Sequence, residues 1–203
     1  MNDKLKYPVI TIGREYCAYG RTVAASLEER LGIKYYDKDF LRKTIAESGF
    51  SEDVVKEESE TMSGGSKLLE DMLNATAIYS SSYDKIYEAQ KEVVLELAKE
   101  PCIIVGRCAN NILRENGIRS FNIYLYADFD FRVKRCAELY NELELDTNNL
   151  EKHVKKMDAD RQVYYKKYAG SEVYDPHNYD ICIDVGKLGP EKTVDLIMSL
   201  ITE

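Results

Sequence analysis

Tryptophan is absent from this chain of 203 residues, and only four prolines and two histidines occur in it. Its five cysteines are scattered and form no C-x-x-C pair, which argues against a disulfide framework and against a structural zinc site. With His153 and His177 as the only histidines, a histidine-rich metal site is not expected either. No apolar run approaches the ~20 residues of a membrane-spanning helix, and residues 1–6 lack the apolar segment of a secretory signal. These absences predict a cytoplasmic protein that does not contact membranes.

Basic residues are also fewer than acidic residues. The chain carries 28 lysines and arginines against 36 aspartates and glutamates, which gives a formal net charge of −8. The long-range field of such a chain repels phosphates, so general binding to nucleic acids or acidic membranes is not expected. A local basic pocket for a small anion is compatible with this balance, and the composition leaves a homo-oligomer open.

The composition is that of a globular protein. Hydrophobic residues make up 44% of the chain and charged residues 32%, which excludes a wholly disordered or collagen-like chain. At this length a single domain over residues 1–203 is the default, with room for small insertions.

Short apolar segments alternate along the chain with amphipathic segments of helical period. The expected strands are 7–12, 34–36, 102–105, 121–126 and 181–183, and the main expected helices are 21–31, 83–99, 150–168 and 190–201. This order predicts an α/β fold with a mainly parallel, five-stranded sheet and helices on both faces. Ligands of such sheets bind at the carboxyl ends of the strands, where Gly13, Asp37, Gly106 and Asp128 stand.

Residues 13–22 join the first expected strand to the first expected helix. A loop in this place can point backbone N–H groups and the positive end of a helix dipole at an anion. In the phosphate-loop pattern G-x-x-x-x-G-K-[ST], Gly20 would be the second glycine, Arg21 the lysine and Thr22 the hydroxyl, while Glu15 replaces the first glycine. Arg21 can bind phosphate as a bidentate fork, so the loop predicts a phosphate site. On the loop alone, a plain strand-to-helix turn is the alternative.

With further segments in register, the chain resembles the cytidylate kinase-like family of P-loop proteins from Tyr7 to Ile201. The segments that carry the resemblance are Arg14-Glu15-Tyr16 with Gly20-Arg21, Tyr36-Asp37 and Gly106-Arg107. The resemblance implies a three-layer P-loop kinase-like fold related to nucleoside monophosphate kinases. It also implies a mobile acceptor-binding insertion, expected at residues 48–82, and a basic lid, expected at residues 130–170.

The resemblance implies roles for particular residues as well. ATP or another nucleoside triphosphate would be bound by Gly13, Arg14, Tyr16, Cys17, Ala18, Tyr19, Gly20, Arg21 and Thr22. Thr22 would also be the protein ligand of Mg²⁺. Asp37, Arg42 and Arg107 would bind the acceptor, because Gly106-Arg107 matches the Gly-Arg that ends the third strand in bacterial cytidylate kinases. Those kinases carry an acidic residue after the Gly-Arg pair, and this chain has Cys108 there.

The region expected to form the lid is rich in basic residues. Arg132 and Arg135 are three apart on one expected helix and share a face, and Arg161 lies among lysines on the next helix. Arginines that arrive from a lid would neutralise a transferred phosphoryl group and exclude water, so these three and Arg21 are the predicted catalytic residues. A solvated basic face of a surface helix is the alternative.

Tyrosines are interleaved with this basic region. Tyr164, Tyr165 and Tyr168 stand beside two lysines, an arrangement that can stack bases in a single-strand channel. Their helical spacing also places them on one face, and packing on the core is the favoured interpretation.

These features predict a phosphotransferase that moves the γ-phosphate of a nucleoside triphosphate to a nucleoside monophosphate or a similar small acceptor. The substituted loop supports a different class of function, a catalytically degenerate module that senses a nucleotide or phosphate. A third hypothesis is an assembly subunit whose pocket is vestigial.

Overall fold

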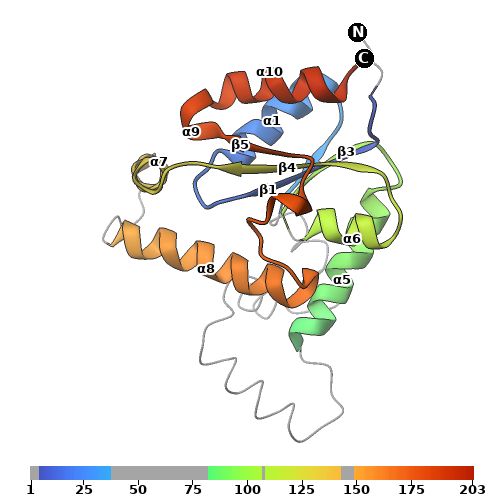
Figure 1. Ribbon diagram of the computed structural model, residues 1–203, viewed down its shortest axis with the longest axis horizontal. Coiled ribbons are helices and arrows are strands. Elements are labelled where there is room, and N and C mark those ends of the chain that lie inside the picture. Colours follow the sequence, from blue (N-terminus) through green and yellow to red (C-terminus); the bar gives the residue numbers. More distant parts are fainter. Residues whose placement is uncertain (1–4, 38–81, 107, 143–148) are drawn as a thin grey trace, which may run out of the picture.

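The computed structural model describes residues 5–37, 82–106, 108–142 and 149–203 (Figure 1). Within these ranges a sheet of five strands has the order β2-β3-β1-β4-β5, and all four neighbouring pairs are parallel. The strands are β1 (Val9–Arg14), β2 (Tyr35–Tyr36), β3 (Cys102–Val105), β4 (Ser120–Tyr126) and β5 (Ile181–Asp184). The expected five-stranded parallel sheet is therefore confirmed.

Helices cover both faces of the sheet. Figure 1 shows α1 (Gly20–Leu31) and α10 (Pro190–Ile201) on one face of the sheet. On the side of the opposite face lie α5 (Ser82–Leu97), α6 (Ala109–Glu115) and α8 (Leu150–Ala169). The described ranges also contain α7 (Phe129–Glu142), α9 (Val185–Leu188) and a short 3-10 helix at Pro176–Asn178. This arrangement confirms the expected three-layer architecture.

The core explains why the strands are continuously apolar. Ile10 and Ile12 of β1 pack in one buried cluster with residues of α1 and α10, whereas Val9 packs in a second cluster with residues of α5 and α6. All three side chains are fully buried. A central parallel strand needs apolar side chains in both directions because helices cover it on both faces.

The first strand extends further than the sequence predicts. Its expected end is Ile12, but Gly13 and Arg14 continue the parallel ladder opposite Tyr124 and Leu125. The reason is the length of β4, which offers partners as far as Tyr126. Because the sheet is parallel, the ends of β1 and β3 and the residue after β2 lie at one edge, where the loop to α1 begins.

The tyrosines of α8 pack as expected. Tyr165 is buried, and its hydroxyl accepts a hydrogen bond of 2.8 Å from Asn110 Nδ2. The Tyr168 ring stacks on Tyr87 of α5 with centroids 4.0 Å apart, and the Tyr164 hydroxyl donates to Gln90 Oε1 at 2.6 Å. The interpretation of these residues as packing residues is confirmed, and the C-terminal half of α8 is anchored on α5 and α6.

Several predictions fall on other parts of the chain. The insertion expected at 48–82 lies almost wholly outside the described residues, as do Arg42 and Arg107. Of the expected lid, α7 and α8 are described. Among the described residues, no helix is long and apolar enough to span a membrane.

Candidate functional site

The loop between β1 and α1 has a tightly turned backbone. Cys17 and Tyr19 adopt left-handed conformations, with φ of 61° and 55°. Residues other than glycine seldom take this conformation, which costs on the order of 1–3 kcal/mol and is typical of ligand-binding loops. Ahead of the turn, the Glu15 N–H donates to Leu125 O at 3.0 Å, which fixes the start of the loop to β4.

Arg14 crosses from the end of β1 toward the end of β3. A Cβ atom at Gly106 would lie 1.9 Å from Arg14 Nη1, and one at Gly20 would lie 2.9 Å from Arg14 Cγ. Both positions therefore need glycine for the arginine to pass. The Arg14 guanidinium lies at the carboxyl edge of the sheet, next to the residue that precedes the predicted acceptor ligand Arg107.

Arg21 and Asp37 lie together at the same edge. Arg21 Nε is 2.8 Å from Asp37 Oδ2, with 55% of the arginine side chain exposed against 14% of the aspartate. The structure thus brings the predicted phosphate ligand of α1 next to the predicted acceptor ligand that follows β2. Thr22, the predicted metal ligand, is exposed in the first turn of α1 beside them.

Glu15, Arg132 and Asp158 form a charged group that we call the Arg132 cluster. Glu15 Oε2 accepts from the Ala127 N–H at 3.0 Å and lies 3.0 Å from Arg132 Nε. Arg132 Nη1 is bonded to Asp158 Oδ2, and Asp158 Oδ1 accepts from the Tyr16 N–H at 2.8 Å. The Glu15 carboxylate is thus engaged where β4 meets α7, with Arg132 as its counter-ion.

The cluster is largely buried, and this burial affects the pKa of Glu15. Only 7% of the Arg132 side chain is exposed, against 27% of Glu15 and 28% of Asp158. Burial raises the pKa of Glu15 above its ordinary value, while the Ala127 N–H and the Arg132 guanidinium act in the opposite direction and nearby Asp158 adds to the rise. The cluster holds two carboxylates against one guanidinium, so Glu15 and Asp158 share Arg132 as their counter-ion.

The other two predicted lid arginines also contact the loop. Arg135 Cζ lies 4.8 Å from the centroid of the Tyr19 ring, and Arg161 Cζ lies 5.1 Å from that of Tyr16. Arg161 Nη1 also donates to Arg14 O at 3.2 Å. The prediction that α7 and α8 bring arginines to this loop therefore agrees with the geometry, and their catalytic role stays a prediction.

Three contacts of the loop were not predicted from the sequence. Asp158 accepts from the Tyr16 N–H, His153 Nε2 lies 3.2 Å from the Tyr16 hydroxyl, and Glu15 pairs with Arg132. Asp158 precedes Arg161 by three residues, so both fall on one face of α8. That spacing is the signal that could have placed an acid beside the predicted lid arginine.

The loop cysteine carries no charge. Cys17 is half-buried, and burial raises the pKa of its thiol far above its ordinary value, with Cys136 as a further cause. The neutral thiol neither attracts nor repels an anion at physiological pH. Cys17 therefore contributes backbone and volume to the loop, with no thiolate chemistry.

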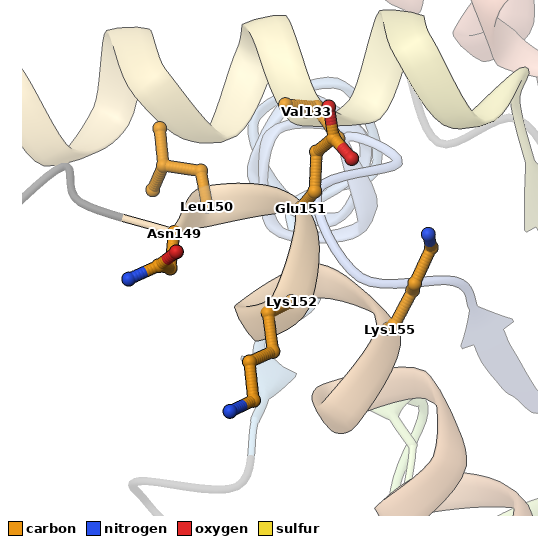
Figure 2. Close-up of a pocket in the computed structure, with 6 residues that line it drawn as sticks. All are labelled: Val133, Asn149, Leu150, Glu151, Lys152 and Lys155. Atoms are coloured by element: carbon orange, nitrogen blue, oxygen red, sulfur yellow. The ribbon is translucent and has the colours of Figure 1, made fainter.

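The described residues also enclose a cavity of about 560 Å³. It lies between α7 and the first turns of α8, and its lining residues are Val133, Asn149, Leu150, Glu151, Lys152 and Lys155. Figure 2 shows Leu150 and Glu151 extending toward α7, with Lys152 pointing the other way. Lys155 Nζ lies 4.9 Å from the centroid of the Phe129 ring, which Arg132 also faces at 5.7 Å. The cavity thus has two lysines in its lining, one of which packs on the same aromatic ring as Arg132.

The profile of the cytidylate kinase-like family matches residues 9–187, which is most of the chain. The protein belongs to this family. It is 28% identical over 128 residues to the cytidylate kinase of Thermoplasma acidophilum. That match spans 62% of this chain and 66% of the relative, just under two thirds of its length.

Two solved structures are similar over nearly the whole chain. An uncharacterised protein from Eubacterium ventriosum aligns over 95% of this chain and 97% of its own, with a TM-score of 0.68 and 27% identity. A shikimate kinase from Bacteroides thetaiotaomicron aligns over the same shares, with a TM-score of 0.57 and 11% identity, which shows the fold alone. The expected P-loop kinase-like α/β fold is therefore confirmed.

Proposed function

We propose that the protein transfers the γ-phosphate of ATP, or of another nucleoside triphosphate, to a nucleoside monophosphate or a similar small acceptor. One observation carries the proposal: arginines from four elements converge on the loop between β1 and α1. They are Arg14 of β1, Arg21 of α1, Arg135 of α7 and Arg161 of α8. In a chain with net charge −8, such a concentration of guanidinium groups at the carboxyl edge of a parallel sheet fits an anionic ligand.

The donor phosphates would lie between the loop and the first turn of α1. The helix N-terminus offers N–H donors and a partial positive charge there, and Arg21 supplies a guanidinium in place of the usual lysine. Arg21 would exchange Asp37 for phosphate oxygens, and Asp37 would contact the acceptor. Phosphoryl transfer needs little covalent chemistry from the protein, because positioning and charge neutralisation supply most of the rate.

Mg²⁺ is the metal that this function implies, and it would offset the negative charge of the phosphates. The residues present fit such an ion. The Thr22 hydroxyl follows Arg21 directly and the Asp37 carboxylate pairs with Arg21, so hard oxygen donors are available at this edge. Thr22 would be the protein ligand.

The acceptor side of the proposal rests on Asp37 together with Arg42 and Arg107. We assign residues 48–82 to an acceptor-binding insertion and 130–170 to a lid, both within a single domain of 1–203. The C-terminal half of α8 is held on α5 through Tyr164 and Tyr168, so lid movement would pivot about that end. No strong general base is required, because an acceptor phosphate is already anionic.

The direct test is a coupled ADP-release assay with ATP and Mg²⁺ over the common nucleoside monophosphates, with CMP first. Turnover with any of them supports the proposal and identifies the acceptor. The second candidate is a sensor without transfer chemistry, which Glu15 in place of a loop glycine and Arg21 in place of lysine favour. Binding of triphosphate without release of ADP for any acceptor would establish that candidate instead.

Replacing Arg21 by alanine is expected to weaken triphosphate binding about tenfold to a hundredfold, because a charge-assisted contact is worth roughly 1.5–3 kcal/mol. Removal of the guanidinium also takes away positive charge beside the Asp37 carboxylate, which adds repulsion in the same direction. The measurement is a titration with a non-hydrolysable analogue. The matched control is Arg30→Ala, which removes an arginine of the same helix whose Nη1 pairs with the exposed Asp195 at 2.6 Å. Equal affinity in Arg21→Ala and the parent would show that Arg21 is only a surface residue.

Arg135→Ala and Arg161→Ala are expected to fold normally and to bind triphosphate within a few-fold of the parent. They should lose most of the phosphoryl transfer, at least about tenfold in kcat, because their charge matters most when charge develops in the transition state. Steady-state kinetics separates the fall in kcat from any change in KM. Lys156→Ala, which removes a cation of α8 paired with Asp160, controls for net charge. Equal losses in binding and in turnover would refute a transition-state role.

A further inference from the structure

We infer that Asp158 competes with the donor phosphates for their binding site at the loop. Its carboxylate occupies the Tyr16 N–H and Arg132, and it must withdraw when a triphosphate binds. The inference rests on the proposed function, because it needs the loop to be the phosphate site. It assigns to α8 a second role besides carrying Arg161: its position depends on whether the loop holds phosphate.

The contacts of Asp158 are those that a phosphate would make. One carboxylate oxygen accepts from the Tyr16 N–H at 2.8 Å, and the other is bonded to Arg132 Nη1. A loop amide and a guanidinium are the two kinds of donor that oxyanions take in such sites. An aspartate from a neighbouring helix thus satisfies donors that face the loop.

The partners of Arg132 divide into fixed ones and a movable one. Glu15 binds Arg132 Nε from the loop and is itself held by the Ala127 N–H, at the junction of β4 and α7. Arg132 also donates to Ala127 O at 3.0 Å. Asp158 instead approaches from α8. If Asp158 withdraws, Glu15 and Ala127 O keep the guanidinium in place, and Nη1, which also donates to Tyr16 O at 3.3 Å, has a further N–H to offer at the loop.

Charge makes the exchange favourable. With Glu15 and Asp158 both ionised, the Arg132 cluster carries one more negative charge than positive, so an arriving triphosphate meets repulsion from Asp158. Withdrawal removes that repulsion and supplies Arg132 as a partner for the phosphate. Because 28% of the Asp158 side chain is already exposed, water can reach its carboxylate as the side chain withdraws. The ion pair that is broken is therefore weaker than a fully buried one.

The same step would act on α8 near Arg161. Asp158 and Arg161 are three residues apart on one face of α8, and both contact backbone atoms of the loop, the Tyr16 N–H and Arg14 O. The C-terminal half of the helix is anchored on α5 by Tyr164 and Tyr168. Loss of the Asp158 contact therefore removes one tie between α8 and the loop. Arg161 keeps its bond to Arg14 O, and His153 Nε2 stays 3.2 Å from the Tyr16 hydroxyl, so α8 can shift while Arg161 remains beside the phosphates.

The test compares Asp158→Asn with Asp160→Asn by calorimetric titration with inorganic pyrophosphate and with a non-hydrolysable ATP analogue. Asparagine keeps the shape and an acceptor for the Tyr16 N–H while removing the charge that holds Arg132. We expect Asp158→Asn to bind both probes about fivefold to tenfold more tightly than the parent. Asp160→Asn removes the same charge from the same helix but from a pair with Lys156, and its affinities should stay within about twofold. Asp158→Ala is the second variant and should shift affinity in the same direction.

The outcomes separate this inference from the proposed function. Affinity that is unchanged or lower in Asp158→Asn and Asp158→Ala, while the parent binds both probes and releases ADP, overturns the competitor and leaves the kinase intact. Tighter binding in both Asp158 variants with no ADP release by any of the proteins supports the competitor and overturns the kinase. Failure of the parent and both Asp158 variants to bind either probe overturns both. An equal gain in Asp160→Asn also overturns the competitor, because net charge alone would then explain it.

Discussion

Replacing Arg132 by leucine is expected to lower the free energy of unfolding by about 2–4 kcal/mol. The guanidinium is almost fully buried and is the shared counter-ion of Glu15 and Asp158. Its loss leaves two carboxylates facing each other in a half-buried place, with two backbone carbonyls deprived of their donor. Breaking a fully buried pair costs about 3–5 kcal/mol, and the partial exposure of both carboxylates lowers that figure. Urea unfolding at neutral pH measures the difference.

The control for this variant is Arg135→Leu, one helical turn further along α7. Arg135, whose side chain is 19% exposed, pairs with the half-exposed Glu138 at 3.1 Å, and a pair with one exposed partner contributes less than about 1 kcal/mol. A loss in Arg132→Leu no larger than that in Arg135→Leu would show that the Arg132 cluster adds nothing beyond a partly exposed ion pair.

The Arg132 variant also has an expected pH dependence. Burial already raises the pKa of Glu15 in the folded protein, and removal of the guanidinium raises it further. A carboxyl group whose pKa is higher in the folded than in the unfolded protein stabilises the fold at low pH, where it is protonated. This contribution is complete below the pKa of the unfolded state and is lost as pH rises through the pKa of the folded state. The deficit of Arg132→Leu against the parent should therefore be smallest below the ordinary Glu pKa of 4.5 and should grow toward neutral pH. A deficit that is constant from acid to neutral pH would contradict this origin.

The sheet and the loop could be predicted because their signals are local. β3 is an uninterrupted Cys-Ile-Ile-Val run, and a buried parallel strand needs that pattern whatever its neighbours are. The end of β1 could not be predicted in the same way. Gly13 and Arg14 are strand residues only because β4 is long enough to pair with them, and that is a property of another segment.

The charged partners around the loop depend on the tertiary fold in the same manner. In the sequence, Glu15 occupies a position where the phosphate-loop pattern has glycine, and a carboxylate that pointed into the site would repel a phosphate. In the structure it binds Arg132 and the Ala127 N–H, which lie more than a hundred residues away along the chain. No periodicity within residues 13–22 contains that information, since it depends on how α7 leaves β4. The i, i+3 spacing of Arg132 and Arg135 did indicate a shared face, but not that one arginine would be buried in a carboxylate pair while the other lies over Tyr19.

Replacing Gly106 by alanine is expected to lower phosphoryl transfer about a hundredfold, which corresponds to roughly 2.7 kcal/mol in the barrier. A Cβ at this position would lie 1.9 Å from Arg14 Nη1, so the guanidinium must leave the end of β3. An arginine that contacts a phosphate contributes roughly 1.5–3 kcal/mol, and under the proposed function Arg14 is such a residue. Gly106 also has a φ of +84°, which costs an alanine on the order of 1–3 kcal/mol of stability.

Gly117→Ala separates the two consequences of the Gly106 substitution. Gly117 has a φ of +67°, and a Cβ there would meet nothing within 4 Å. Both variants therefore carry similar backbone strain, and only Gly106→Ala displaces Arg14. We expect comparable losses of stability in urea unfolding, with transfer retained in Gly117→Ala and lost in Gly106→Ala. If the two variants lose the same fraction of transfer, the strain alone accounts for it, and Arg14 has no part in binding phosphate.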